Sequence, residues 1–359
     1  MKFAIIGIQN LKHMTTVSVY TDVFDKYNMY YDMIYIDKYG IEEKSNANNV
    51  YVYKADSKRM QSKTGKLLEA VRFRNYAIKI IEREKYDFLI LWREHTVSLF
   101  SSYVSRKYSN RYSVNIRDLW NSRNCVFTLL IKHAIKSSLF NTVCSDGFIP
   151  FLPKADYLFL HCINYEAIKR MVLVPTEKKV NSVLTLSFIG TVRFANYCCK
   201  VVEAFGNDER FILKFIGQGS EIIKNYASER GFTNVECVGA FEPELTAELL
   251  EGTDIINCAY GAMSEAERSL LPTRFYYAVH MGIPIICSKG TWLERVANEK
   301  KIGITIPAEI DKVDGISDDV YESYMKMDFS MMRNECKKYI DEIDCAFEQF
   351  KNILITLDK

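Results

Sequence analysis

The sequence predicts an α/β protein built from two doubly wound domains. Short apolar runs alternate with helical stretches through most of the 359 residues, and this alternation stops and restarts near the middle of the chain. Continuous apolar runs of this kind are typical of parallel strands that helices cover on both faces. The chain is also long enough to form two domains with separate cores.

In the first half, six apolar runs are expected to form strands, with helices between several of them. The strands are FAIIGI, MIYI, VYVY, FLILW, YSVNI and NTVCS, and the helices lie at about 65–84, 97–107 and 122–137. We expect residues 1–170 to form the first domain.

The same alternation restarts in the second half, at residue 183. The expected strands are VLTLSFIG, FILKFIG, VECVG, DIINC and IPIIC, within a second domain at 171–335. The polar segment 164–182 contains a proline and is expected to link the two domains. A long helical stretch runs from about 331 to 355, and residues 336–359 are expected to form a terminal helix that packs back on the first domain.

The stretch LPTRFYYAVHMGIPII indicates a helix that leads into a buried strand. Pro272 suits the first helical turn and Gly282 suits the left-handed helix end. Packing does not explain Arg274, which falls where free N–H groups and the helix dipole already favour an anion. A guanidinium at this position would complete a binding site for a diphosphate. The alternative is that Arg274 is a solvated surface arginine.

Glycines follow several strands of the second half, where ligands of doubly wound sheets bind. Gly190 and Arg193 follow one strand, and Gly217 and Gly219 follow the next. Glycine lets a ligand approach the backbone closely, and Arg193 together with Arg274 would bring two cations to one crevice. The alternative for the Gly-Gln-Gly segment is an ordinary strand-to-helix turn.

The formal net charge of +2 conceals an asymmetry between the two halves. Residues 1–170 contain 26 Lys and Arg against 16 Asp and Glu, whereas the remainder contains 21 against 29. Part of the excess lies in one segment, through Lys58, Arg59, Lys63 and Lys66. These side chains could contact an anionic membrane or a phosphorylated substrate, or form a solvated helix face. No nucleic-acid recognition motif accompanies the charge.

Composition narrows the class of protein further. No apolar run approaches the roughly 20 residues that span a bilayer. The ten cysteines are scattered without CxxC spacing, which disfavours a disulfide framework or a zinc site and favours a reducing cytoplasm.

The second half resembles the donor-binding domain of GT-B glycosyltransferases, particularly the family 4 type of bacterial capsule and exopolysaccharide synthesis. The resemblance rests on FIGTVR, FIGQGSE, VECVGAFEPEL, TDIINCAYG, LPTRFYYAVHMGIPII and GTWLERVANEKKIGITI, in the family's order. A weaker match in the first half covers Gly7, DFLILWREH, VNIRD and CSDGFIPFLP. The resemblance implies two Rossmann-like domains that face each other across a cleft.

In this family two basic residues hold the donor diphosphate, and the resemblance gives these roles to Arg193 and Arg274. It implies retention of configuration. Two cations at the diphosphate could replace a metal ion, and no DxD-like cluster stands at a strand end to hold magnesium, so no metal is expected. No cofactor is expected, since the nucleotide-sugar is a substrate. The motifs also place Phe241 and Glu294 on the donor side. The family's two glutamates, eight positions apart, are replaced by Ser269 and Tyr277. A tyrosine hydroxyl could bond the ribose, while Glu267 or Glu265 could contact the sugar.

The first half supplies candidates for the acceptor side. His95 follows FLILW and is a candidate catalytic residue, with a structural histidine as the alternative. Arg117 and Asp118 end another strand, where a local ion pair between them would shape an acceptor pocket. Gly7 ends the first strand on the same side.

These observations predict a cytoplasmic glycosyltransferase, peripheral at the membrane, that moves a sugar from a nucleotide donor to a saccharide or polyprenyl-linked acceptor. One alternative is a nucleotide-sugar epimerase on the same scaffold, which needs acid and base carboxylates that the second half does not obviously offer. Another is a catalytically silent partner subunit, suggested by Ser269 and Tyr277 but disfavoured by the two retained arginines.

Overall fold

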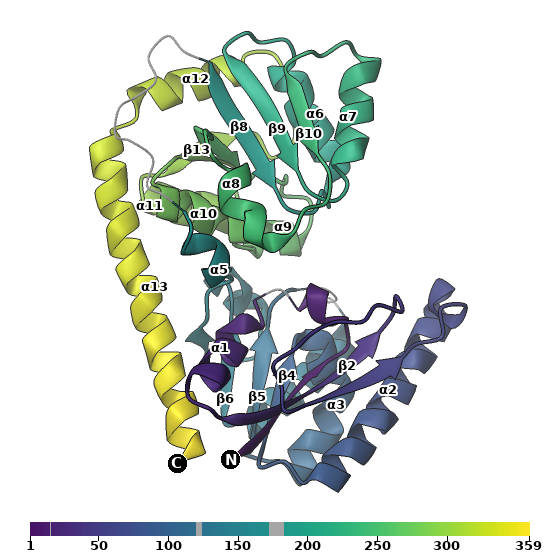
Figure 1. Ribbon diagram of the computed structural model, residues 1–359. Coiled ribbons are helices and arrows are strands. Elements are labelled where there is room, and N and C mark those ends of the chain that lie inside the picture. Colours follow the sequence, from purple (N-terminus) through teal and green to yellow (C-terminus); the bar gives the residue numbers. More distant parts are fainter. Residues whose placement is uncertain (15, 120–123, 172–182) are drawn as a thin grey trace. The chain divides into compact units, whose positions relative to one another are not determined.

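The computed structural model describes residues 1–14, 16–119, 124–171 and 183–359 (Figure 1). The chain divides into two compact units. Met1–His161 and Cys345–Lys359 form the first, and Cys162–Asp344 form the second. Each unit contains one parallel sheet with helices around it, so the predicted pair of α/β domains is confirmed. The first unit ends at His161, earlier than the expected boundary at residue 170.

The first unit contains every strand that the sequence predicts for it, together with α1 and β7. Its elements, with η for a 3-10 helix, are β1 (Lys2–Gly7), η1 (Leu11–His13), α1 (Ser18–Lys26), β2 (Tyr30–Asp37), β3 (Asn49–Lys54), η2 (Arg59–Gln61), α2 (Lys63–Glu84), β4 (Phe88–Trp92), α3 (Glu94–Lys107), β5 (Tyr112–Ile116), α4 (Cys125–Ser137), β6 (Phe140–Val143), η3 (Asp146–Phe151) and β7 (Leu158–Phe159). The parallel strands lie in the order β3-β2-β1-β4-β5-β6-β7. Residues 122 and 123 of one expected helix lie outside the described residues.

The second unit contains the five expected strands and a sixth, β13. Its elements are α5 (Tyr165–Ile168), β8 (Leu184–Ile189), α6 (Ala195–Phe205), β9 (Phe211–Ile216), α7 (Ser220–Glu229), β10 (Val235–Val238), η4 (Pro243–Leu245), α8 (Thr246–Leu249), β11 (Ile255–Asn257), α9 (Glu265–Ser269), α10 (Thr273–Met281), β12 (Ile285–Ser288), α11 (Trp292–Glu299), β13 (Gly303–Ile306), α12 (Ile316–Lys326) and α13 (Phe329–Asp358). The parallel order is β10-β9-β8-β11-β12-β13. Most of the expected linker, at 172–182, falls outside the described residues.

Both faces of the first sheet are covered. Residues 3–6 of β1 have no exposed surface, as expected for a strand with helices on both sides. The end of α13 belongs to this unit, where Phe350 packs edge-on against Tyr20 of α1 at 4.8 Å between ring centroids. The N-terminal amino group of Met1 pairs with Asp358 of the same helix. The prediction that the terminal helix contacts the first domain is thus confirmed.

Each sheet has one point at which the strand order reverses. In the first unit β1 pairs with β2 on one side and with β4 on the other, and in the second unit β8 lies between β9 and β11. Ligands of open α/β sheets bind just beyond the strand ends at such a switch point. The loops after β1, β4, β8 and β11 are therefore the places where a site is expected.

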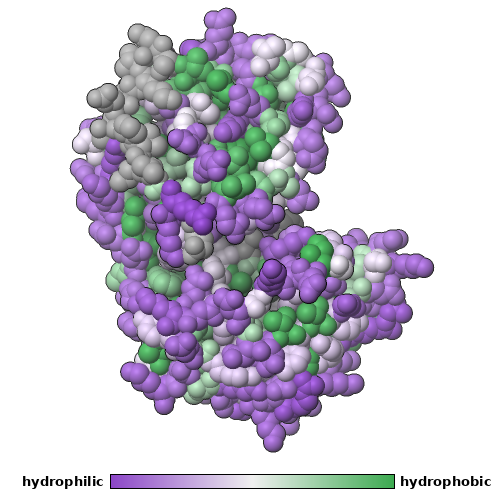
Figure 2. All heavy atoms as spheres, viewed as in Figure 1, coloured by the Kyte–Doolittle hydropathy of each residue, from purple (hydrophilic) through white to green (hydrophobic). Residues whose placement is uncertain are grey.

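Hydrophilic residues cover most of the viewed surface of both units, with hydrophobic residues scattered among them (Figure 2).

Candidate functional site

A buried arginine lies at the switch point of the second sheet. The Arg274 side chain, which belongs to the first turn of α10, is only 6% exposed. Its guanidinium carbon lies 4.0 Å from the ring centre of Phe188 in β8 and 4.4 Å from that of Tyr260 after β11. Both distances are within the range of cation–π contacts. The guanidinium therefore lies against two aromatic rings, one from β8 and one from the loop after β11.

The hydrogen bonds of Arg274 leave part of its guanidinium free. Nε donates to the carbonyl oxygen of Asn257 at 2.6 Å, but the buried Nη2 atom has no partner among the described residues. No described carboxylate forms an ion pair with Arg274. A buried cation without a counter-charge is costly, and an anionic ligand would remove that cost.

The local sequence explains how Arg274 reaches this position. Pro272 is the N-cap of α10, directly before the helix rather than within its first turn as the sequence suggests. Gly282 ends the helix in the left-handed conformation, at φ 66°, as predicted. Asn257 is the last residue of β11. Its carbonyl oxygen accepts the hydrogen bond from Arg274, at the start of α10.

The second predicted cation, Arg193, lies near the same tyrosine. Arg193 follows β8, is exposed, and forms no hydrogen bond or ion pair with any residue in the described ranges. Burial raises the pKa of Tyr260, while the positive charges of Arg274 and Arg193 both act to lower it. Both positive charges therefore act on the Tyr260 hydroxyl at the switch point.

Glycines allow two adjacent loops to lie in contact beside these arginines. A Cβ atom on Gly217 would stand 2.2 Å from the carbonyl oxygen of Gly190, and both glycines have positive φ. The N–H of Gly190 bonds to the Ile216 carbonyl at 2.9 Å, which joins the loops after β8 and β9. The N–H of Gly219 is occupied by the Glu221 carboxylate at 3.1 Å. Close backbone packing accounts for Gly217, and a φ of 119° accounts for Gly190, in both cases without a ligand.

Two other predicted donor-side residues cap helices. The Glu267 carboxylate accepts hydrogen bonds from the N–H groups of Met263 and Ser264 at the start of α9. The Glu294 carboxylate accepts from Gly290 N–H at 2.6 Å, before α11. These bonds explain both residues structurally, and a sugar contact for either remains a prediction.

The remaining predicted residues of the second unit differ in accessibility. Tyr277 and Ser269 are buried, and burial raises the Tyr277 pKa to about 12. Phe241 is partly exposed after β10. A ribose contact by the Tyr277 hydroxyl therefore requires access to a largely enclosed side chain and remains a prediction.

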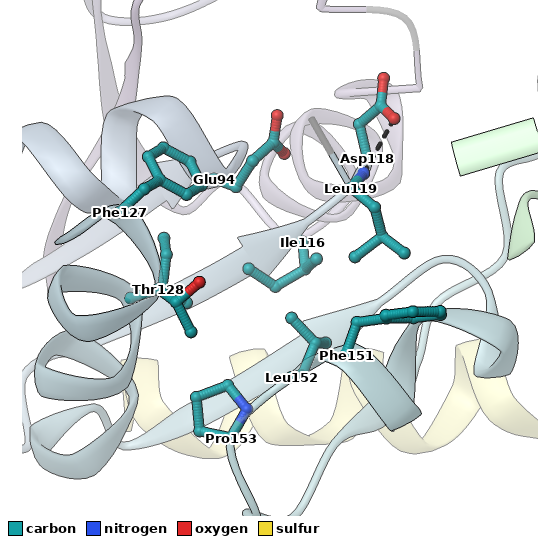
Figure 3. Close-up of a pocket in the computed structure, with 10 residues that line it drawn as sticks. Glu94, Ile116, Asp118, Leu119, Phe127, Thr128, Phe151, Leu152 and Pro153 are labelled. Atoms are coloured by element: carbon teal, nitrogen blue, oxygen red, sulfur yellow. Dashed lines mark hydrogen bonds between the residues drawn. The ribbon is translucent and has the colours of Figure 1, made fainter. Parts of the chain in front are cut away.

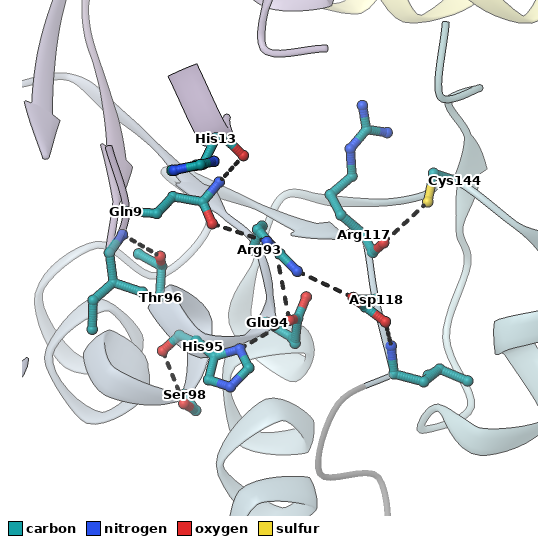
Figure 4. A network of polar contacts seen from close by, with 12 residues as sticks. Gln9, His13, Arg93, Glu94, His95, Thr96, Ser98, Arg117, Asp118 and Cys144 are labelled. Carbon is teal, nitrogen blue, oxygen red and sulfur yellow. Dashed lines mark hydrogen bonds and ion pairs between the residues drawn. The ribbon is translucent and has the colours of Figure 1, made fainter. Parts of the chain in front are cut away.

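The switch point of the first unit carries a charged network (Figure 4). Arg93 follows β4 at φ 71°, and its guanidinium donates to Gln9 at 2.9 Å and to Asp118 at 3.2 Å. Glu94, the first residue of α3, accepts a hydrogen bond from His95 Nδ1 at 2.9 Å. His95 is thus held by its neighbour, with its ring 42% exposed.

The expected ion pair between Arg117 and Asp118 is wrong. Asp118 pairs with Arg93, while Arg117 donates to the carbonyl of Leu160 and to Thr16 and lies over the Trp92 ring at 4.8 Å. Arg117 and Asp118 are consecutive in an extended segment, so their side chains point to opposite sides.

Gly7 lies at the end of β1, against the side chain of Met14. A Cβ atom on Gly7 would stand 2.7 Å from the Met14 sulfur. This packing accounts for the glycine without a ligand, and a role toward the acceptor remains a prediction.

Comparison with known proteins places this geometry in a known architecture. No family model and no curated protein sequence matches the chain. Sucrose-phosphate synthase from Thermosynechococcus elongatus superposes with a TM-score of 0.70 at 12% identity, covering 99% of this chain and 98% of that one. The Anabaena protein Alr3699/HepE, in complex with UDP-glucose, gives 0.68 at 11% identity over 99% and 100% of the two chains. The lipopolysaccharide outer core galactosyltransferase WaaB gives 0.62 at 14% identity over 99% of both.

The chain has the GT-B fold. In this GT-B protein the two arginines, the aromatic rings and the glycine turns all lie at the switch point of the second sheet. Within the described ranges, no three His, Cys, Asp or Glu side chains are grouped so that they could hold a metal ion. No described helix is both long and apolar enough to cross a bilayer.

Sequence reasoning did not identify several residues that build this GT-B site. Phe188 and Tyr260 flank Arg274, and Ser288 of β12 accepts hydrogen bonds from the N–H groups of Tyr260 and Gly261. The Ala-Tyr-Gly segment after a strand was a usable signal for Tyr260. In the first unit the sequence singles out His95, whereas its neighbour Glu94, the first residue of α3, is the buried one.

Proposed function

We propose that this protein is a glycosyltransferase that moves a sugar from a nucleotide-sugar donor to a saccharide or lipid-linked saccharide. The observation that carries the proposal is the buried Arg274 guanidinium, which lies beside Tyr260 and whose Nη2 atom has no hydrogen-bond partner in the described chain. A donor diphosphate is an anion of the right kind for two such cations. The complexes of Alr3699/HepE with UDP and with UDP-glucose support the same ligand class.

The chemical role of the two arginines follows from charge. As the bond between sugar and diphosphate breaks, the leaving nucleoside diphosphate gains negative charge, and fixed cations stabilise that state more than the ground state. One charge pair at about 4 Å contributes roughly 4 kcal/mol at an effective dielectric near 20. We therefore propose a mechanism in which arginines, not a metal, stabilise the leaving group, with retention of configuration as the family resemblance implies.

The acceptor and the cellular setting are also part of the proposal. The resemblance favours synthesis of a cell-surface polysaccharide, on the inner face of a membrane. Lys58, Lys63 and Lys66 are exposed near the start of α2 and form no ion pair with described residues. Arg59 pairs with the buried Glu69 at 3.2 Å and so offers less free charge. This basic segment supports reversible contact with anionic lipid.

A thermal-shift panel tests the proposed donor. We expect UDP or another nucleoside diphosphate to raise the melting temperature in proportion to log concentration, because the ligand binds the folded state. The Arg274→Ala variant should lose this stabilisation. If no nucleoside diphosphate or nucleotide-sugar stabilises the wild-type protein, the proposed function is wrong. Stabilisation without transfer to any acceptor would favour a binding-only partner subunit.

A further inference from the structure

The two units close the carboxyl ends of their strands in different ways. Beyond β5 in the first unit, the side chains of Ile116, Leu119 and Leu152 line a hollow of about 20 Å³, which has room for about one water molecule (Figure 3). Beyond β11 in the second unit, hydrogen bonds hold a turn at 258–261. The position of this turn therefore depends on individual polar atoms, which single substitutions can remove.

The Ser288 hydroxyl accepts two hydrogen bonds from the backbone of this turn. Its oxygen lies 3.1 Å from the backbone nitrogen of Tyr260 and 2.9 Å from that of Gly261. Ser288 is the last residue of β12 and is 1% exposed, so it reaches the turn from the strand next to β11. One side chain thus satisfies two consecutive N–H groups.

A second hydroxyl fixes the orientation of the first. Ser288 donates its hydroxyl hydrogen to the Tyr197 oxygen at 3.1 Å, and Tyr197 donates to the carbonyl oxygen of Pro307 at 2.6 Å. A serine oxygen has one hydrogen and two lone pairs. Since the hydrogen goes to Tyr197, both lone pairs are available to the N–H groups of the turn.

The Tyr197 ring also packs against this turn, at Gly261. A Cβ atom on Gly261 would stand 3.2 Å from that ring and 3.3 Å from the carbonyl oxygen of Ala308, and the φ of Gly261 is 86°. Glycine fits both the space and the left-handed backbone. Tyr197 of α6 therefore contacts the turn through its ring and reaches it again through Ser288.

Arg274 contacts the chain both just before this turn and within it. Its Nε atom donates to the Asn257 carbonyl at 2.6 Å, and its guanidinium carbon lies 4.4 Å from the centre of the Tyr260 ring. The Asn257 side chain accepts a hydrogen bond from the N–H of Ala259 at 3.0 Å, which joins the two contact points. A shift of the turn would therefore move the groups that hold the cation.

We propose that Ser288 and Tyr197 are positioning residues for nucleoside diphosphate binding, because they fix the turn against which the Arg274 guanidinium lies. The inference rests on the proposed function, since the bound anion is the donor diphosphate. The two hydroxyls act through Arg274 and do not contact the ligand. Because Ser288 already takes up the N–H groups of Tyr260 and Gly261, the guanidinium and not the turn supplies hydrogen bonds to the anion.

Calorimetric titration of the full chain with UDP tests this assignment, and any other nucleoside diphosphate that the thermal-shift panel identifies replaces UDP. Ser288→Ala should weaken binding by about tenfold or more, because two N–H groups lose their partner and the turn is no longer fixed. Ser288→Thr keeps the hydroxyl and should recover most of the affinity. Tyr197→Phe should weaken binding by about threefold, because the Ser288 hydrogen loses its acceptor.

Ser187→Ala is the matched control. Ser187 is a fully buried serine of β8 in the same sheet, and its hydroxyl bonds to that of Thr253 at 2.8 Å. This variant loses a buried hydrogen bond away from the turn, so its affinity for UDP should stay within about twofold of wild type. Urea unfolding of every variant establishes that the titrated protein is folded.

A double variant separates positioning from a general loss of stability. Since Ser288 acts through Arg274, Ser288→Ala should weaken UDP binding by less than about twofold when Arg274 is already replaced by lysine. A purely structural role of Ser288 predicts the same fold-change in both backgrounds.

The outcomes separate this inference from the proposed function. The inference is overturned if folded Ser288→Ala binds UDP as tightly as the wild-type protein, or if Ser187→Ala weakens binding equally. Should Ser288→Ala not fold, unchanged UDP binding by Tyr197→Phe overturns it. In each of these cases, UDP binding by the wild-type protein leaves the proposed function standing. If the wild-type protein binds no nucleoside diphosphate, the proposed function is overturned and this assignment with it.

Discussion

The Nε atom of Arg274 donates a hydrogen bond to the carbonyl oxygen of Asn257, 2.6 Å away. Because the acceptor is a neutral carbonyl and not a carboxylate, the bond fixes the guanidinium without cancelling its charge. The rings of Phe188 and Tyr260, 4.0 and 4.4 Å from its central carbon, restrain it further. The remaining N–H groups are thus held in place for an anion before any ligand arrives, as electrostatic stabilisation of a transition state requires.

Replacing this cation should affect transfer far more than folding. We expect Arg274→Ala to lower kcat/KM by about 100-fold or more, the size of the effect when one electrostatic donor is removed from a reacting centre. Arg274→Lys should recover only part of the loss, because an ammonium cannot keep both the Asn257 bond and a planar contact with two rings. Steady-state kinetics with the donor found in the thermal-shift panel measure both effects.

Arg193→Ala should also lower kcat/KM by about 100-fold or more, because it too removes an electrostatic donor. A suitable control is Arg295→Ala, because Arg295 is 65% exposed and pairs with Glu299 on α11. Near-normal transfer by the Arg193 or Arg274 variant would remove that residue from the proposed diphosphate site.

The contact between the loops after β8 and β9 predicts that one methyl group added at Gly217 strongly lowers the stability of the protein. Gly217→Ala should destabilise the protein by about 2 kcal/mol or more, because its φ is 131° and the new Cβ would stand 2.2 Å from the Gly190 carbonyl. Gly239→Ala is the matched control, since a Cβ there meets nothing within 4 Å. Urea unfolding of both variants measures the difference, and equal stability would contradict a tight contact between these loops.

The position of Arg274 was predictable because local rules determine it. Pro272 and Gly282 bracket α10, and the apolar run after Gly282 forms β12. Strands such as β1, β4, β5 and β12 were predictable for the same reason, since each is a short apolar run that is almost entirely buried. The two-residue β7 carries too little pattern to be read from sequence.

The surroundings of Arg274 depend on tertiary packing, which local rules do not give. Phe188 and Tyr260 come from β8 and the loop after β11, which become neighbours only when the sheet forms. Asn257 acts through its backbone, so its side-chain identity gives no hint of the contact. The predicted ion pair between Arg117 and Asp118 is wrong for a similar reason. The partner of Asp118 is Arg93, which follows a different strand.

Metal independence is a separate prediction, motivated by the two arginines near Tyr260. We expect EDTA to leave the transfer rate within about twofold of its value without chelator, because fixed cations already neutralise the leaving group. Initial rates with and without EDTA, followed by addition of magnesium, provide the measurement. Loss of activity with EDTA and its recovery with magnesium would contradict the two-arginine mechanism.

Asp208 should make stability depend on pH in the acid range. Arg210 donates two hydrogen bonds to its carboxylate, at 2.9 and 2.7 Å, and these hold the Asp208 pKa at about 2. Since the folded pKa is below the unfolded value of about 3.9, the stabilisation is present above pH 4 and is lost as the pH falls toward 2.

Asp208→Asn should therefore lower the free energy of unfolding by about 1–2 kcal/mol at pH 7 and by about half as much at pH 3. Urea unfolding at the two pH values measures the change. Asp318 bonds to the same Arg210 but is 65% exposed, so Asp318→Asn serves as a control with little expected effect. A constant difference between pH 7 and pH 3 would show that Asp208 does not act through its charge.

The start of α2 combines free positive charge with exposed apolar side chains, which predicts two modes of membrane contact. Leu67, Leu68 and Val71 are 66%, 44% and 41% exposed, beside Lys63 and Lys66. Lysines attract an anionic surface at about 1 kcal/mol each, and salt screens this attraction. Exposed leucines can enter the headgroup region, and salt does not screen that contribution.

We expect the protein to sediment with vesicles rich in anionic lipid at low salt and to be released largely at high salt. Replacing Lys58, Lys63 and Lys66 with glutamine should weaken binding by about 100-fold, whereas Arg59→Gln should have a small effect because Glu69 already neutralises that charge. The matched control replaces three exposed lysines of the second unit that form no ion pair with described residues, Lys224, Lys312 and Lys337. Leu67→Ser combined with Leu68→Ser should remove the part of the vesicle binding that remains at high salt.

Equal binding to neutral and anionic vesicles, or none to either, would make this segment an ordinary solvated helix face and favour a soluble acceptor.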